Sequence, residues 1–159
     1  MKGMRALVTA LAVAMAVTPA VAVAQEAEVL QLINKERAKK GCAPLTMNSQ
    51  LSAAAKGHAT AMAKQNFFSH KGKSGSTLRS RATKAGYKGR KLGENIAAGW
   101  PTPAKAVSQW MNSPGHRKNI LTCSFKETGI AMVYDPNDAP LPGNSYAMKY
   151  YWVQVFGTR

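Results

Sequence analysis

The sequence has few cysteines, few histidines and no long apolar run, and each shortage excludes a class of protein. The 2 cysteines do not form a C-x-x-C pair, which argues against a cysteine metal site or a dithiol redox centre. The main apolar run, residues 6–17, has 12 residues, well short of the ~20 that a membrane-spanning helix needs. The 3 histidines include no H-E-x-x-H motif. The chain therefore lacks a local signature of a metalloprotease, a redox enzyme or a membrane-spanning protein.

The N-terminal segment has the pattern of a secretory leader. Basic residues precede the apolar run, and Ala22-Val23-Ala24 offers small residues for cleavage before Gln25. We therefore predict a signal peptide over 1–24 and one exported domain, periplasmic or secreted, over 25–159. The alternative is a retained membrane anchor, which the short apolar run makes less suitable.

Export would place the two cysteines, Cys42 and Cys123, in an oxidising compartment. Their even number and the lack of a C-x-x-C spacing favour one structural disulfide over two free thiols. Such a bond would close a long loop, which gives an upper stabilisation of ~4–5 kcal/mol in the chain-entropy view.

Acidic residues are scarce, and the excess positive charge is unevenly spread. Loss of Lys2 and Arg5 with the leader reduces the 22 basic residues to 20, against 7 acidic ones. The segment 71–91, here called the basic segment, holds eight of the basic residues and no acid. It is either a solvated loop or a surface that docks on anionic lipid headgroups or cell-wall polymer. The docking residues in that case are Arg79, Arg81, Lys84 and Lys88. Specific nucleic-acid binding has charge alone in its favour, since no recognition motif accompanies it.

Helical patterns come first along the chain and strand patterns last. Apolar spacing and end signals predict helices over 29–39, 49–65, 77–84 and 104–111. A further helix restarts with Ser113 as cap and Pro114 in its first position. Alternating and aromatic residues predict strands over 128–134 and 146–156, paired as a hairpin, and a short strand over 95–98. Segregated helices and strands indicate an α+β domain rather than a doubly wound sheet.

Three separate segments contain the most informative polar residues. They are Phe67-Phe68-Ser69-His70, Gly93-Glu94-Asn95-Ile96-Ala97 and the stretch 110–121, which includes Pro114-Gly115-His116. In the last, the helix restart places His116 in a first turn, near free backbone N–H groups. Because no local motif joins the three segments, only the fold could bring His70, Glu94 and His116 together.

These segments, in this order, resemble the CAP superfamily of cysteine-rich secretory, antigen 5 and plant pathogenesis-related proteins, in its short bacterial secreted form. The resemblance covers roughly residues 29–158. It implies a three-layer α-β-α sandwich in a single domain, with a cleft where His70, Glu94 and His116 meet. Two neutral imidazoles and one carboxylate would suit Zn²⁺ or another divalent metal with an open position.

The chain departs from the family pattern at the cleft. Eukaryotic members have a second cleft Glu at the position of Ser113, and many bacterial relatives have an Asp in the loop where 71–76 has none. Glu127 is the other acid nearby in sequence and a weak candidate for a fourth member. A place at the surface, opening a strand, is the simpler interpretation of that residue.

Several other residues have simpler structural interpretations. His58, between alanines at helical spacing, fits a buried packing histidine better than a ligand. Asn95 is expected to hold the backbone beside Glu94, and the large aromatics are expected to fill the core. The core aromatics in question are Trp110, Phe125 and Trp152. Neither Ser69 nor Ser113 lies in a G-x-S-x-G motif, which argues against a serine hydrolase.

The leading interpretation is an exported, monomeric binding protein of the CAP type. Its cleft would take a divalent metal or a small polar or lipid ligand, and its basic segment would associate with the anionic cell envelope. One alternative is a metal-assisted hydrolase with Glu94 as base or ligand. The other is a structural envelope protein with a vestigial cleft. Loss of the second Glu counts against an enzyme, since fewer carboxylates remain to position water.

Overall fold

The computed structural model describes residues 19–159, so most of the predicted leader lies outside the described residues. The elements in chain order are α1 (Pro19–Lys39), β1 (Thr46–Met47), α2 (Ser49–Lys64), α3 (Leu78–Lys84), β2 (Lys91–Ala98), α4 (Pro103–Asn112), α5 (Pro114–Ile120), β3 (Glu127–Tyr134) and β4 (Tyr150–Thr158).

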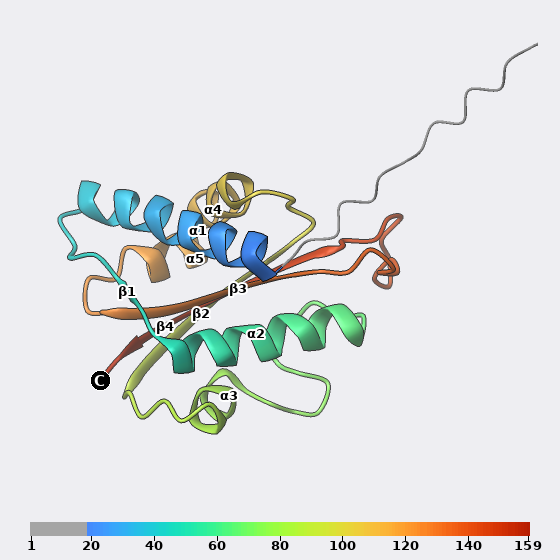
Figure 1. Cartoon of the computed structure of the whole chain (residues 1–159), viewed down its shortest axis with the longest axis horizontal. Coiled ribbons are helices and arrows are strands. Elements are labelled where there is room, and N and C mark those ends of the chain that lie inside the picture. The colour runs from blue at the N-terminus through green and yellow to red at the C-terminus, as the bar shows by residue number, and fades with distance from the viewer. Residues whose placement is uncertain (1–18) are drawn as a thin grey trace, which may run out of the picture.

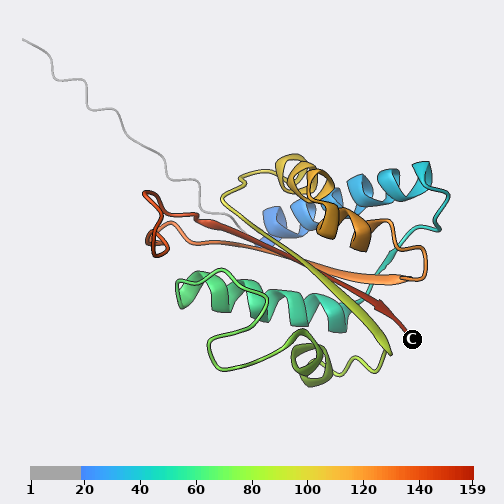
Figure 2. The same cartoon turned by 180° about the vertical axis from the view of Figure 1, so that it is seen from behind.

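A four-stranded sheet lies between two layers of helices. Its strand order is β1-β3-β4-β2, with β1 parallel to β3 and the other neighbours antiparallel. Helices α1, α4 and α5 cover one face, and α2 and α3 cover the other (Figure 1; Figure 2 shows the same layers from behind). This arrangement confirms the predicted α+β sandwich. It also makes β2 an edge strand, which exposes one of its sides to neighbouring loops.

Each face of the sheet has its own apolar core, because successive side chains of a strand point to opposite faces. Towards α1, α4 and α5 the core includes the three aromatics predicted to be buried, and all are at most 3% exposed. Towards α2 and α3 it includes Leu51, Met62, Tyr151 and Val153. The two cores hold both helical layers against the sheet and so fix the elements that flank β2.

Local signals explain most of the helix ends. Asn48 caps α2 by accepting from Leu51 N–H, and Thr77 forms a capping box with Ser80 at the start of α3. Pro103 opens α4 as expected. The predicted cap at Ser113 is wrong in one respect, because its side chain makes no capping bond. The backbone of Ser113 instead ends one helix and starts the next, donating to Trp110 O and accepting from Arg117 N–H.

Three elements begin earlier or later than predicted, and one short strand was not predicted. Helix α1 begins at Pro19 rather than residue 29, because its alanine-rich first turns favour helix but carry no apolar stripe. Strand β1 has only 2 residues and gave no pattern, β2 begins at Lys91 rather than 95, and β4 begins at Tyr150 rather than 146. Among the described residues no helix, α1 included, is long and apolar enough to cross a bilayer.

The Cys42–Cys123 disulfide is present, as predicted, and joins the turn after α1 to the turn after α5. Beside it, the fully buried Arg37 supports the same connection. Its guanidinium donates five hydrogen bonds to the carbonyls of Ala43, Ile120, Thr122 and Phe125. The sequence pattern did not single out Arg37. Together the two features anchor the C-terminal end of α5, the helix that carries His116.

Candidate functional site

Glu94 lies at the centre of the cleft, on the edge strand β2. Its Oε1 is 2.8 Å from His70 Nδ1, and its Oε2 accepts from Arg81 Nη2 at 2.7 Å. His70 comes from the loop between α2 and α3, and Arg81 comes from α3. The three side chains therefore form one hydrogen-bonded cluster built from three separate segments.

The Glu94 side chain is buried, at 3% exposure. Burial alone would raise the pKa of Glu94, because a low-dielectric environment disfavours the charged form. The hydrogen bonds from His70 and Arg81, together with the guanidinium charge, outweigh burial and lower the pKa of Glu94 below its ordinary value. Glu94 is therefore an ionised carboxylate at neutral pH.

His70 is the exposed member of the cluster, with 57% of its side chain accessible. Since ionised Glu94 only accepts hydrogen bonds, His70 Nδ1 carries the proton in this contact. A hollow of about 370 Å³ lies here, lined by His70, Lys71, Thr77, Leu78 and Glu94. Its mixed lining offers hydrogen-bonding groups to a small polar molecule.

His116 approaches this region from α5, in the other helical layer. Asn95 donates to His116 O at 3.2 Å, and Asn119 donates to Glu94 O at 3.2 Å and to Asn95 Oδ1 at 2.9 Å. These bonds attach α5 to β2, with Asn119 rather than Asn95 holding the backbone carbonyl of Glu94, whereas the Asn95 side chain holds the carbonyl of His116.

The His116 imidazole is not part of the hydrogen-bonded cluster around Glu94. Its Nδ1 is buried with no hydrogen-bond partner in residues 19–159. Burial lowers the pKa of His116, and the positive form of His70 lowers it further. The structure thus joins His70 and Glu94 directly, and it places His116 within electrostatic reach of His70.

Glu127 lies outside the cleft. Its carboxylate contacts Asn48, Tyr87 and Arg159. Glu94 is in register with Val155 and Glu127 with Gly157, so the two acids are two strand spacings apart across the sheet, about 10 Å, and two residues apart along it, about 7 Å. This separation is too great for Glu127 to be a fourth ligand.

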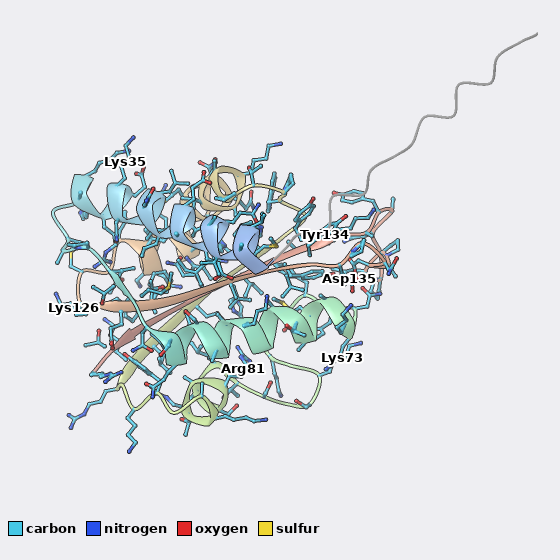
Figure 3. All side chains as sticks on the ribbon, in the orientation of Figure 1. Lys35, Lys73, Arg81, Lys126, Tyr134 and Asp135 are labelled. Atoms are coloured by element: carbon cyan, nitrogen blue, oxygen red, sulfur yellow. A yellow bond between two sulfur atoms is a disulfide. The ribbon has the colours of Figure 1, made fainter. Side chains whose placement is uncertain are left out.

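Arg81 is the cleft residue that the sequence did not identify. It was assigned to the docking surface, but its side chain is 10% exposed and paired with Glu94. Figure 3 shows Arg81 between α2 and α3, whereas Lys35, Lys73 and Lys126 lie at the periphery. The spacing from Leu78 to Ala82, both packed towards the core, places Arg81 on the inner side of α3. That spacing was the signal that could have revealed its burial.

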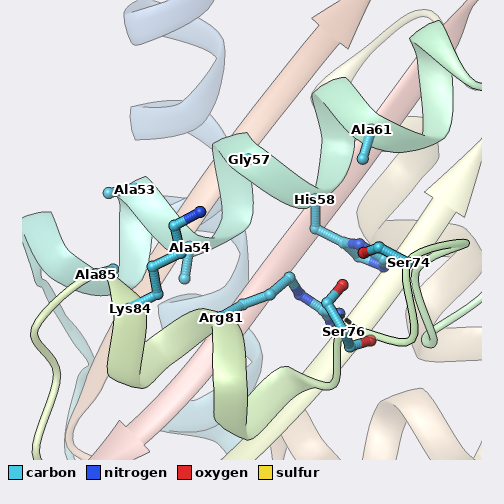
Figure 4. Close-up of a pocket in the computed structure, with 10 residues that line it drawn as sticks. All are labelled: Ala53, Ala54, Gly57, His58, Ala61, Ser74, Ser76, Arg81, Lys84 and Ala85. Atoms are coloured by element: carbon cyan, nitrogen blue, oxygen red, sulfur yellow. Dashed lines mark hydrogen bonds between the residues drawn. The ribbon is translucent and has the colours of Figure 1, made fainter.

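A second hollow, of about 400 Å³, lies between parts of α2 and α3 and is lined mainly by small residues, alanine, glycine and serine (Figure 4). His58 and Arg81 both border it. His58 is 1% exposed, and its Nε2 lies 2.9 Å from Ser69 O. Burial lowers the pKa of His58, so the ring is neutral and packs as the sequence predicted. Its bond to Ser69 holds the loop that carries His70.

The cluster does not form a metal site as it stands. Within residues 19–159 no three His, Cys, Asp or Glu side chains are grouped so that they could hold an ion. The chemistry of the donor set explains this, because both oxygens of Glu94 already accept hydrogen bonds from cationic or N–H groups. The predicted ligand set of His70, Glu94 and His116 therefore does not fit a divalent metal in this arrangement.

The match to a family model covers residues 30–156 and describes the cysteine-rich secretory protein family, CAP. The chain belongs to this family. The Bacillus subtilis (strain 168) protein YkwD is 38% identical over 110 residues, which is 69% of this chain and 43% of that protein. The membrane protein YlbC of the same strain is 34% identical over 107 residues, 67% of this chain and 31% of that protein. The chain thus spans less than half the length of these two relatives.

Solved structures agree with this assignment. An extracellular protein containing a SCP domain from Bacillus anthracis str. Ames matches with a TM-score of 0.75 and 29% identity, over 89% of this chain and 44% of that one. An outer surface protein from Borrelia burgdorferi matches with a TM-score of 0.74 and 20% identity, over 86% of this chain and 93% of that one. The second likeness supports the fold alone.

Proposed function

We propose that this chain is an exported CAP-domain binding protein that attaches to an anionic surface of the cell envelope. The observation that carries the proposal is the unequal exposure of its charges. Of the 20 Lys and Arg in residues 19–159, 18 are exposed, whereas Glu28 is the only exposed acid there. The folded surface is therefore more strongly cationic than the net charge suggests, and it attracts polyanions over a long range.

The other acids are partly or fully buried and engaged inside the fold. Their contacts are Glu26 with Met132 N–H, Glu36 with Lys39, Glu94 with His70 and Arg81, Glu127 with Tyr87 and Arg159, Asp135 with Lys64, and Asp138 with Tyr151. Three of these acids neutralise exposed cations, namely Lys39, Lys64 and Arg159, and the other 15 exposed Lys and Arg form no ion pair within residues 19–159. Attraction to lipid headgroups or cell-wall polymer follows from that imbalance.

The cleft suits binding of a small polar ligand better than hydrolysis. A general base must take up a proton near the working pH, and the lowered pKa of Glu94 makes it a weak base. The hollow beside it is lined by polar residues that can hydrogen-bond a ligand, namely the exposed His70, Lys71 and Thr77.

Export of the chain is supported by its leader pattern and by its similarity to a protein described as extracellular.

The test is binding of the mature protein to anionic phospholipid vesicles and, separately, to purified cell-wall polymer. Binding should weaken steeply between low and physiological salt, where charges are screened over ~8–10 Å. Replacing Lys84, Lys88 and Arg90 by Gln removes three exposed charges from the basic segment while keeping Arg81. The matched control replaces three exposed lysines on or directly after helices of the other layer, namely Lys35, Lys40 and Lys105.

We expect a larger loss of binding for the basic-segment variant than for the control, with little change in thermal stability in either. Whichever of the two, phospholipid vesicles or cell-wall polymer, is bound with this salt dependence is the surface to which the protein attaches. Salt-independent association, or full binding by both variants, would contradict the proposal.

A further inference from the structure

We propose that Arg81 is the resident cation of the cleft and occupies the position beside Glu94 that a divalent metal would need. The inference concerns the chemistry of the cleft and does not depend on envelope attachment. It explains why a chain with the family's His, Glu and His residues does not arrange them as a metal site.

The geometry of the Glu94 carboxylate is the first argument. Arg81 Nη2 lies 2.7 Å from Oε2, and His70 Nδ1 lies 2.8 Å from Oε1. A carboxylate oxygen binds Zn²⁺ at about 2.0–2.2 Å, so an ion on Oε2 would overlap the guanidinium. On Oε1 it would displace the His70 proton donor. Both oxygens are therefore engaged in the folded protein, Oε2 by Arg81 and Oε1 by His70.

The charge balance of the cleft is the second argument. A guanidinium stays protonated at any working pH, and one carboxylate already neutralises it. A divalent ion would bring two further positive charges next to Arg81 and near Lys71. The hollow offers no second acid to offset them, since Glu94 is the one acid among its lining residues and 71–76 contains none. The charges of Arg81 and Glu94 already balance, so the cleft needs no metal for charge neutrality.

The third argument is that Arg81 is held in place. Its Nη1 donates to Ser76 O at 3.2 Å, and the neighbouring Ala82 is fully buried against the core. The capping box of Thr77 and Ser80 fixes the first turn of α3. In Figure 4 the Arg81 side chain extends from α3 towards Ser76 and past the hollow. Arg81 therefore stays beside Glu94 in the folded protein, and freeing Oε2 requires a mutation of Arg81 rather than a change of its rotamer.

The test is titration with Zn²⁺ alone near pH 7.5, above the ordinary histidine pKa of ~6.5, by calorimetry and by NMR of the histidine rings. The wild type should show no binding that depends on His70 or Glu94. Arg81→Ala and Arg81→Gln should each gain such binding, and adding Glu94→Gln to either should abolish it. Arg79→Ala, on the exposed side of the same helix, is the matched control and should behave as wild type.

Two results would overturn the proposal. One is Zn²⁺ binding by the wild type that His70→Ala or Glu94→Gln removes, which would mean that Arg81 yields to the metal. The other is folded Arg81→Ala or Arg81→Gln protein that binds Zn²⁺ no better than wild type. Arg81→Gln removes the charge but keeps more of the side-chain volume than Arg81→Ala, so it guards against a failure of Arg81→Ala to fold.

Discussion

Two carboxylate–arginine pairs lie on the same face of the sheet and differ mainly in burial. Glu94 and Arg81 are 2.7 Å apart, with side chains 3% and 10% exposed. Glu127 and Arg159 are 3.4 Å apart, with side chains 22% and 61% exposed. The same two functional groups therefore occur once in the interior and once at the surface of a single domain.

The comparison shows that environment, and not residue type, decides which acid belongs to a site. At the surface, water solvates either charge when its partner leaves, so the pair contributes little. In the interior, removing one partner leaves the other charge without compensation. Glu94 therefore depends on its hydrogen bonds with His70 and Arg81. Glu127 instead holds Arg159 and the Tyr87 hydroxyl at one end of the sheet.

The largest expected effect comes from breaking the buried pair. Arg81→Ala should lower the free energy of unfolding by about 3–5 kcal/mol, because it leaves the Glu94 carboxylate uncompensated. Arg159→Ala, which breaks the exposed pair, should cost less than about 1 kcal/mol. Urea denaturation of the two variants measures both values. Equal losses would show that the difference in burial has no energetic consequence.

A smaller effect should appear on acidification. The pKa values of Glu94 and Glu127 both lie below the ordinary 4.5, so each acid stabilises the fold above that pH and loses the contribution as pH falls through its folded pKa. Glu94→Gln should therefore be much less stable than wild type at neutral pH, and this deficit should shrink as pH falls through the lowered folded pKa of Glu94, because the wild-type side chain then becomes neutral too.

The control for this pH series is Glu127→Gln, for which the gap should be small at every pH. Thermal unfolding of the three proteins across the series provides the measurement. A Glu94→Gln deficit that persists unchanged in acid would point to lost packing rather than lost charge.

The smallest effect concerns Tyr87 at the surface pair. Burial, then the hydrogen bond to Glu127 and its negative charge, raise the pKa of Tyr87 to about 12. Glu127→Gln removes the charge and should bring the pKa of Tyr87 down towards 10, while burial keeps it above that value. Ultraviolet titration of the phenolate in both proteins gives the shift. An unchanged pKa would assign the whole effect to burial.

Much of the fold and part of the site followed from the sequence. The α+β class came from the order of the helical and strand patterns, and the three-layer sandwich came from the family resemblance that the three informative segments carry. The pairing of Cys42 with Cys123 came from their even number and the expected export, and the burial of His58 came from its helical spacing among alanines. Helix α1 was predicted too short, because its first turns carry no apolar stripe.

The sequence by itself determined which family the chain belongs to and which residues could meet in its cleft. Only the tertiary structure decided that Arg81 faces Glu94, that Glu127 does not, and that His116 stays outside the hydrogen-bonded cluster. In the sequence Arg81 is one of eight cations in the basic segment. Helix α3 turns Arg81 towards Glu94, which lies 13 residues further along the chain on the edge strand β2. Burial there makes this one basic residue the partner of a carboxylate, and no local sequence pattern records that burial.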